Sequence, residues 1–374
     1  MIILCITITV LYLALIVSFT IGFDKVKTFV LSDIQAKTRF SVVIPFRNEA
    51  YNLPKLLRSL EHLNYSKHLF EVILIDDESE DNSVALINTA LNNSGLNLKI
   101  IQNDRITNAP KKDAITNAIK QAKHEWIVTT DADCILPKFW LDSFDGFIQN
   151  HNTVCITAPV TYYDEHSFLS RFQSLDFMSL QGATIGGFGV SQPFLCNGAN
   201  FAYTKATFQE LNGFEGNSNI SSGDDIFLLE KIIIKYPKLI HYLKFEKAIV
   251  STKPQPSWAA LIEQRIRWAA KTGNYHSWFG KLTGLSVFLM NLMILILPVL
   301  SLFGFFNIKI WVYILVIKLN IDFLLLYKTS AFFNQRQVFR SFLISFFIYP
   351  FFSVYVAILS LFKGYKWKGR SFKR

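Results

Sequence analysis

Three polar clusters in this chain of 374 residues each follow an apolar run directly, and their side chains could bind a cation or a phosphate group. They are Arg47-Asn48-Glu49, Asp76-Asp77 and Asp131-Ala132-Asp133. Carboxylates that gather in one place repel each other unless a cation or a hydrogen-bonding ligand lies between them. A single Asp-x-Asp is most often a solvated turn, but directly after an apolar strand it can reach a divalent cation that bridges two phosphates.

The elements that would position these clusters alternate between residues 40 and 163. Short apolar runs take turns with amphipathic stretches, which indicates an α/β fold with a mostly parallel sheet. Ligands in such sheets bind beyond the carboxyl ends of the strands, where the three clusters would lie. The strands are expected at 40–45, 71–76, 98–102, 126–130 and 154–159, and helices at 53–63, 83–91 and 113–122.

The composition points to a lipid environment. Hydrophobic residues make up 51% of the chain and include 35 Phe, more than a soluble domain of this size would bury. The net charge is +10, with six basic residues in the last twelve, beside an apolar run, so anionic lipid is the expected partner and nucleic acid is not. The four cysteines form no CxxC pair, and the chain contains no GxGxxG or P-loop motif.

An uncharged apolar run at residues 1–23 is long enough to cross a bilayer. A cleaved signal peptide would need a charged start and a small-residue cleavage site, which this run does not supply. Lys25, Lys27, Lys37 and Arg39 follow the run, so the positive-inside rule places the following domain in the cytoplasm. We expect an integral membrane protein, in the plasma or inner membrane if it is bacterial.

Three further apolar stretches, at 282–306, 308–327 and 339–362, predict a C-terminal membrane region with two or three spans. The middle stretch contains Lys318 and Asp322, which could pair on one helix face or could lie at the interface of a tilted segment. If all three stretches cross, the basic tail 363–374 lies outside, against the positive-inside rule.

Taken in order, the motifs resemble those of the family 2 glycosyltransferases with the GT-A fold, in particular the membrane-integrated branch that includes ceramide glucosyltransferases and polysaccharide synthases. The resemblance covers essentially the whole chain, and the ordered set is far more specific than any single motif. The matching segments are 41–49, 75–79, 111–114, 130–133, 222–225, 264–268 and 366–370.

The resemblance implies an inverting transfer of a sugar from a nucleotide sugar, with UDP as the expected nucleotide, to a lipid or polysaccharide acceptor. It implies Mg²⁺ or Mn²⁺ held by Asp131 and Asp133, where charge develops on the leaving diphosphate. The implied donor contacts are Pro45, Arg47, Asn48, Glu49, Asp76, Asp77, Lys112, Asp131, Gln264, Arg267 and Trp268.

The acidic pair Asp224-Asp225 occupies the position of the family's catalytic base, and we expect Asp225 to take the acceptor proton, with Asp224 as a second catalytic residue near the acceptor. These residues also fit a helix start, where the helix dipole favours acids. The segment 196–200 is expected on the acceptor side of the site. The family's processive members have Thr-Glu-Asp where this chain has Gly-Asp-Asp, which leaves processivity open, although a single transfer is slightly favoured.

Gln264, Arg267 and Trp268 share one helix face, and the resemblance implies that Trp268 stacks on a sugar ring while the other two contact the donor. The same helix could lie at the membrane headgroups. The predicted division is 1–23 anchor, 38–255 cytoplasmic GT-A domain, 256–281 interface region, 282–362 membrane region and 363–374 basic tail. Competing hypotheses are a metal-dependent phosphotransferase or phosphoesterase and a non-catalytic membrane scaffold.

Overall fold

The computed structural model describes residues 1–93, 95–163, 166–367 and 370–372. Contacts divide the chain into two compact units. The sheet unit comprises Lys27–Tyr163 and Cys196–Lys253, and the helical unit comprises Met1–Val26, Asp164–Leu195 and Pro254–Arg374. The predicted linear domain 38–255 is therefore interrupted, since 164–195 groups with the helical unit. Part of the predicted basic motif 366–370, namely 368–369, lies outside the described residues.

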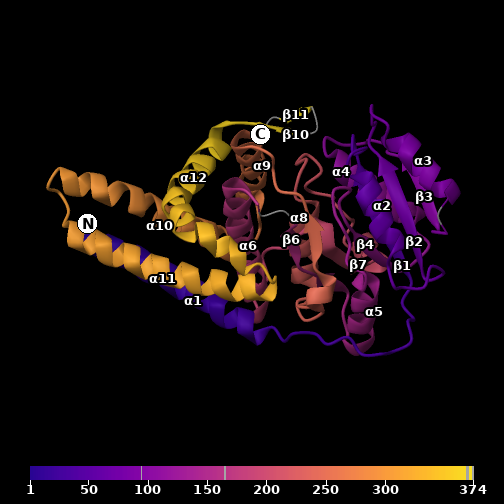
Figure 1. The fold of residues 1–374 in the computed structure, drawn as a ribbon, viewed down its shortest axis with the longest axis horizontal. Helices are drawn as coiled ribbons and strands as arrows, with labels where there is room; N and C mark the ends of the chain where they lie inside the picture. The colour runs from indigo at the N-terminus through magenta and orange to yellow at the C-terminus, as the bar shows by residue number, and fades with distance from the viewer. Residues whose placement is uncertain (94, 164–165, 368–369, 373–374) are drawn as a thin grey trace. The chain divides into compact units, whose positions relative to one another are not determined.

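A seven-stranded sheet in the order β3-β2-β1-β4-β7-β5-β8 forms the centre of the sheet unit (Figure 1). Neighbouring strands are parallel except where β7 pairs with β4 and β5, so the predicted mostly parallel sheet is confirmed. The strands are β1 Phe40–Phe46, β2 Phe70–Asp76, β3 Leu98–Gln102, β4 Trp126–Thr129, β5 Cys155–Thr157, β7 Phe201–Thr204 and β8 Ile240–Tyr242.

The register of the parallel strands brings the polar clusters to one edge. Phe46 pairs with Asp76, and Val43 pairs with Thr129, so the residues that follow β1, β2 and β4 leave the sheet side by side. The strands themselves are buried, which their β-branched and aromatic residues favour. The connecting helices are α2 Leu53–Glu61, α3 Ser83–Asn93, α4 Pro110–Gln121 and α5 Trp140–Asn150.

The remaining elements of the sheet unit are small. β6 Val160–Tyr162 and β9 Val250–Thr252 form a separate parallel pair, and α7 Lys205–Glu210 follows β7. Helix α8, Asp224–Lys235, begins after Gly223, whose φ of 82° lies in the left-handed region that favours glycine. This turn places the acidic pair in the first turn of α8, at its positive dipole end. Short 3₁₀ turns lie at η1 Gly198–Asn200 and η2 Glu246–Ala248.

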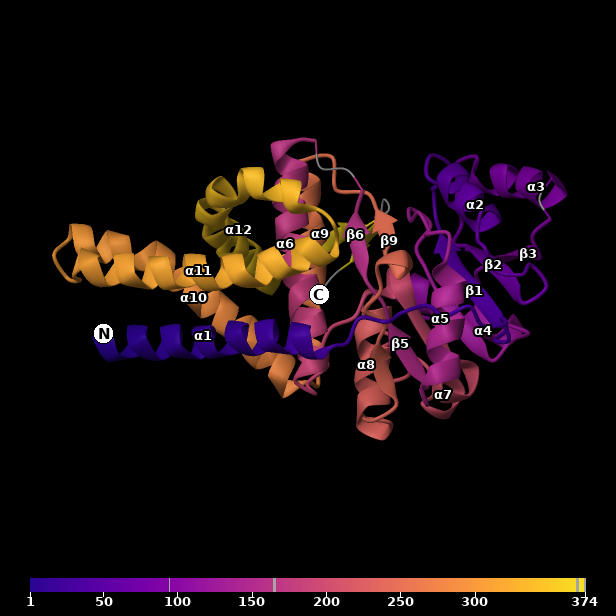
Figure 2. The ribbon, with the colours of Figure 1, turned by 60° about the horizontal axis from the view of Figure 1, so that its bottom comes forward.

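The helical unit contains the four described helices that are long and apolar enough to cross a membrane. These are α1 Ile2–Lys25, α10 Trp278–Leu302, α11 Ile308–Phe332 and the segment Arg336–Phe362, which combines η4 Arg336–Ser341 with α12 Phe342–Phe362. Two other helices, α6 Phe168–Gly189 and α9 Trp258–Ala270, belong to the unit, η3 Thr272–Asn274 follows α9, and β10 Tyr365–Trp367 pairs with β11 Arg370–Phe372 (Figure 2).

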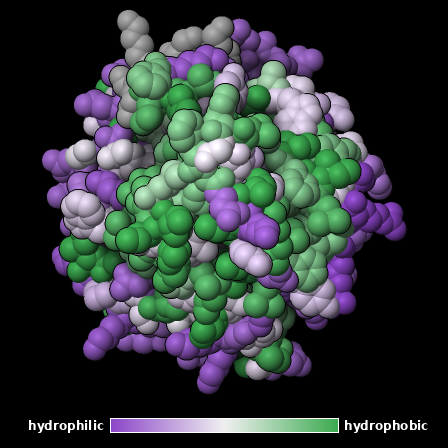
Figure 3. All heavy atoms as spheres, turned by 90° about the vertical axis from the view of Figure 1, so that its left-hand side faces the viewer, coloured by the Kyte–Doolittle hydropathy of each residue, from purple (hydrophilic) through white to green (hydrophobic). Residues whose placement is uncertain are grey.

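Glycines allow α1 and α6 to pack closely. A Cβ atom on Gly22 would lie 2.2 Å from the carbonyl oxygen of Gly186, a distance at which backbone atoms clash. Large apolar side chains cover the end of the unit that carries residue 1 and the turn between α10 and α11 (Figure 3). Leu302 and Phe303 there remain 86% and 72% exposed, as expected for a lipid-facing surface.

The predicted pairing of Lys318 with Asp322 is present inside α11. Lys318 Nζ lies 2.5 Å from Asp322 Oδ2, and Lys318 is only 1% exposed, so the pair is buried between helices rather than interfacial. Tyr12 of α1 donates its hydroxyl to Asp322 Oδ1 at 2.6 Å. This hydrogen bond links α11 to α1. Charged residues within membrane segments commonly pair with other polar groups in this way.

Candidate functional site

The loops after β1 and β2 are tied together by Arg47 and Asn48. Arg47 Nη1 donates to the carbonyl oxygens of Asp77, at 2.8 Å, and of Glu78, while Nη2 donates to Glu80 Oε1 at 2.8 Å. Asn48 accepts the Glu80 N–H at 2.8 Å and has a φ of 51°, a conformation that Asn tolerates better than most residues. Arg47 and Asn48 were both predicted to contact the nucleotide sugar. In the structure they shape the loop by bonding to its backbone.

Asp77 is held by two residues that the sequence analysis did not single out. Asn103 Nδ2 and Arg105 Nε both donate to Asp77 Oδ1, at 2.8 and 2.5 Å. Both follow β3, so applying the rule of strand carboxyl ends to this strand as well would have found them. Asp76 accepts the Ser79 N–H at 3.0 Å, which closes the turn after β2.

Lys111, at the start of α4, joins acids from two distant parts of the chain. Its Nζ lies 2.7 Å from Asp131 Oδ1 and 3.2 Å from Asp224 Oδ2. Burial on its own would lower the pKa of Lys111, but the charges of Asp131, Asp224 and Asp225 outweigh it and raise that pKa overall. Acids from two distant parts of the chain, Asp131 and Asp224, therefore meet around an ammonium group.

The neighbouring Lys112, which was predicted to contact the donor, is directed elsewhere. Its Nζ donates to the backbone and side-chain oxygens of Asn217 at 2.8 and 3.1 Å and lies 4.7 Å from the centre of the Phe227 ring. The residue is 2% exposed. Adjacent positions on a helix point about 100° apart, and of these two lysines Lys111 is the one that pairs with Asp131 and Asp224.

The carboxylate of Asp225 is oriented by backbone N–H groups. Gly198 donates to Oδ2 at 3.0 Å, and Ile226 donates to Oδ1 at 2.7 Å. Thr129 holds the other side of the same peptide segment, because its hydroxyl donates to the Gly198 carbonyl at 2.7 Å. Asp225 is thus bonded to the segment 196–200, whereas Asp224 pairs with Lys111, and the catalytic roles of the two acids stay predictions.

Among the described residues of this centre, the carboxylates of Asp131 and Asp133 are the groups that suit a divalent cation. The side chain of Asp131 is 37% exposed and bonded to Lys111, and Asp133 accepts a weak contact from the Cys134 thiol at 3.8 Å. Among the described residues, no three His, Cys, Asp or Glu side chains are gathered as a metal group requires. The carboxylate oxygens of Asp131 and Asp133 fit a hard cation whose coordination is completed by water and by oxygens of a bound ligand.

The thiol of Cys134 lies directly beside these acids. Burial, together with the charges of Asp133 and Asp131, raises its pKa well above the ordinary value. A neutral thiol is a poor metal ligand and a poor nucleophile. Cys134 therefore behaves as a small apolar side chain under the loop.

In the helical unit, α9 presents the predicted Gln264, Arg267 and Trp268 with their side chains partly exposed. Arg265, which was not predicted, is buried between them: its Nε lies 2.6 Å from Asp176 Oδ2 of α6, and its guanidinium lies 4.2 Å from the centre of the Trp268 ring. Arg265 also donates to the Gln264 side chain. The roles predicted for Gln264, Arg267 and Trp268 toward the donor stay predictions.

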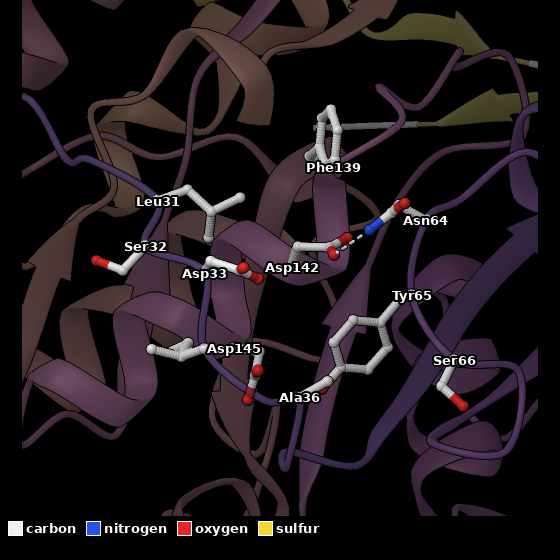
Figure 4. Close-up of a pocket in the computed structure, with 11 residues that line it drawn as sticks. Leu31, Ser32, Asp33, Ala36, Asn64, Tyr65, Ser66, Phe139, Asp142 and Asp145 are labelled. Atoms are coloured by element: carbon white, nitrogen blue, oxygen red, sulfur yellow. Dashed lines mark hydrogen bonds between the residues drawn. The ribbon is translucent and has the colours of Figure 1, made fainter.

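A pocket in the sheet unit lies at the other end of the strands (Figure 4). Tyr65 and Asp145 line it, and Asn64 donates to Asp142 at 2.8 Å across it. Tyr65 precedes β2 in the chain, whereas the acids at Lys111 follow β2 and β4, so the pocket is at the amino-terminal edge of the parallel strands. None of the predicted site residues lines it.

Comparison with known families decides what the sheet unit is. Residues 41–211 match the model of glycosyl transferase family 2. The chain carries a family 2 glycosyltransferase domain. The matched segment contains Lys111 and Asp131 and ends before Asp224 and Asp225, which the structure adds to the same cluster.

Individual relatives of the glycosyltransferase domain match it over part of their length. The poly(ribitol-phosphate) beta-N-acetylglucosaminyltransferase TarS of Staphylococcus aureus is 32% identical over 115 residues, which cover 31% of this chain and 20% of TarS. The probable glycosyltransferase YdaM of Bacillus subtilis is 22% identical over 240 residues, which cover 62% of this chain and 54% of YdaM. The chain thus spans about a fifth to a half of these relatives.

Among solved structures, the mannosyltransferase PcManGT of Pyrobaculum calidifontis, in complex with GDP-Man and Mn²⁺, resembles this chain with a TM-score of 0.56. The likeness covers 95% of this chain and 99% of PcManGT at 16% sequence identity. At this identity the likeness concerns the fold. The predicted GT-A fold of the glycosyltransferase domain is confirmed, and so is the resemblance to family 2.

Proposed function

We propose that this protein transfers a sugar from a nucleotide-sugar donor to a lipid or glycan acceptor at the cytoplasmic face of a membrane, with inversion at the anomeric carbon. The observation that supports this most is the meeting of Lys111, Asp131 and Asp224 beside the oriented carboxylate of Asp225. A donor diphosphate needs positive charge, an attacking hydroxyl needs a base, and this centre offers both within one cluster.

In this proposal Asp225 takes the proton of the acceptor hydroxyl as that hydroxyl attacks the sugar. The Gly198 and Ile226 N–H groups hold the carboxylate in place, so little motion is needed before the proton moves. Lys111 stabilises the charge of the leaving diphosphate, in place of the predicted Lys112. The loops that Arg47 and Asp77 shape would receive the nucleotide.

A divalent cation, Mg²⁺ or Mn²⁺, would be held by Asp131 and Asp133. When bound, it would supply further positive charge to the diphosphate. The complex of PcManGT with GDP-Man and Mn²⁺ supports a nucleotide-sugar donor, whereas a uridine nucleotide is supported by the motifs alone. The four apolar helices support a membrane location and therefore an acceptor at the bilayer.

The test is release of nucleoside diphosphate from a panel of UDP- and GDP-sugars, with Mn²⁺ and membrane lipid extracts as acceptors. Asp225→Asn should lower the rate by roughly 10²–10⁴-fold, since the general base is lost. Asp142→Asn, at the opposite end of the strands, is the matched control and should retain activity. Full activity of Asp225→Asn would refute its assignment as the base.

A further inference from the structure

Contacts near the ends of the apolar helices show which helix ends lie on the same face of the membrane. Lys328, near the end of α11, lies 2.5 Å from Asp24, near the end of α1, and further back Tyr12 bonds to Asp322. Helices α1 and α11 therefore run parallel. Their C-terminal ends share the face on which the chain leaves α1 for the sheet unit.

Helix α10 runs in the opposite direction and reaches the other face. It is joined to α11 by the short turn 303–307, and the indole of Trp311 donates to the Ile294 carbonyl at 3.1 Å, which pairs the two helices near this turn. Figure 1 shows the turn beside residue 1, at the far end from α6 and α9. The start of α10 at Trp278 thus lies on the same face as the end of α1.

Both ends of α12 are fixed to helices on this first face. At its start, Arg171 of α6 donates to the Ser341 hydroxyl at 2.6 Å. Just past its end, Lys363 Nζ lies 2.8 Å from Glu263 Oε1 of α9, the helix that precedes α10. Pro350 lies inside α12, and proline kinks a helix because it lacks an N–H group. Figures 1 and 2 show the helix bent, with both ends turned toward α6 and α9.

We propose that α12 does not cross the membrane but enters and leaves by the face that carries the end of α1. Its 21 residues could span about 30 Å, so length and composition alone would predict a crossing. The contacts at its two ends decide against one. An exposed apolar stripe would dip into the acyl chains of the lipid, and it consists of Leu343, Phe347, Phe351, Tyr355, Ile358 and Phe362.

The charge distribution favours this topology independently. With α12 re-entrant, the six basic residues of the tail 363–374 share one face with Lys25 and Lys27, in accord with the positive-inside rule. On the opposite face the turn 303–307 contains no Lys or Arg, and one basic residue, Lys309, follows it closely. The conflict between three crossings and a basic tail disappears. This inference rests on the proposed membrane location and not on the transfer chemistry.

The test uses the full chain in sealed membrane vesicles of both orientations and a membrane-impermeant maleimide. Single cysteines are placed at Gln337, between α11 and α12, at Phe305, in the α10–α11 turn, and after residue 374. The wild-type chain gives the background from its four natural cysteines, and the cysteine after residue 374 requires no substitution that could disturb folding. Transfer activity is measured separately, so failure of the topology and failure of the function are distinguishable.

We expect Gln337→Cys and the C-terminal cysteine to react from one side of the membrane and Phe305→Cys to react from the other. Reaction of Gln337→Cys and the C-terminal cysteine from opposite sides would show that α12 crosses and would overturn the proposal. Reaction of all three from one side would overturn it as well, since the α10–α11 pair would then not reach the far face.

Discussion

Lys111 Nζ lies 2.7 Å from the carboxylate of Asp131, at the place where the family resemblance implies a divalent cation. Two cations cannot occupy one position, so the ammonium group and a free metal ion should compete for Asp131. We expect Lys111→Met to raise the affinity for Mn²⁺ without nucleotide by roughly tenfold or more, because a neighbouring positive charge is removed. Calorimetric titration with Mn²⁺ measures this affinity without any need for activity.

The matched control is Lys120→Met, the same charge change at an exposed position later in α4. Because the neighbouring acids raise the pKa of Lys111, its charge is present below the ordinary lysine pKa of about 10.4 and is lost only above it. The difference between wild type and Lys111→Met should therefore be the same at pH 7 and pH 9. Equal Mn²⁺ affinities of the Lys111→Met and Lys120→Met variants would contradict the competition.

Gly198 leaves room for both acids of α8. An added Cβ atom would lie 3.1 Å from Asp224 Oδ2 and 3.5 Å from Asp225 Cβ. We expect Gly198→Ala to lower kcat by roughly ten- to hundredfold through displacement of these groups. Gly95→Ala is the control, since only the end of a lysine side chain lies within 4 Å of its added Cβ atom. Wild-type kcat in Gly198→Ala, measured at saturating donor, would show that the close fit is not needed.

The pair of Asp176 and Arg265 supports the helix that carries Gln264 and Trp268. Both charged side chains are 6% exposed, so Asp176→Leu should cost about 3–5 kcal/mol of unfolding free energy by removing the carboxylate that pairs with the buried Arg265 guanidinium. The double variant Asp176→Leu/Arg265→Met should recover most of this stability, measured by denaturant unfolding in detergent. If Arg265 also positions Gln264 and Trp268, the double variant should still bind donor more weakly than wild type. Normal donor affinity would limit the pair to a structural role.

Lys318 and Asp322 form a buried pair, whereas Lys328 and Asp24 form an exposed one in the same helix bundle. Asp322→Leu should destabilise the detergent-solubilised protein by about 3–5 kcal/mol, because Lys318 loses its carboxylate and Tyr12 loses its acceptor. The side chains of Lys328 and Asp24 are 31% and 58% exposed. Lys328→Met should therefore change the free energy of unfolding by only about 0–1 kcal/mol. Similar losses of stability in the two variants would argue that burial does not govern these pairs.

Local patterns in the sequence were sufficient to predict five of the seven strands of the sheet, the apolar helices and the edge at which the polar clusters lie, but not β7 and β8. The apolar runs that mark strands and helices are local properties of the sequence. Because the carboxyl ends of parallel strands lie at the same edge of a sheet, residues that follow such strands can be expected to form a site together. The motif order likewise identified family 2 and the GT-A fold. The pairing of Lys318 with Asp322 was also readable, since residues four apart on a helix are neighbours.

Only the tertiary structure decided which of two adjacent lysines faces the site. It also decided which helices the two ends of α12 contact. Lys111 and Lys112 are identical in type and adjacent in sequence, and the helix rotation that separates them is set by packing around Asn217 and Phe227. Arg265 pairs with Asp176, which lies 89 positions away in the sequence, and Lys363 pairs with Glu263, which lies 100 positions away. Such long-range contacts depend on how the helices pack together, and no local pattern of residues encodes that packing.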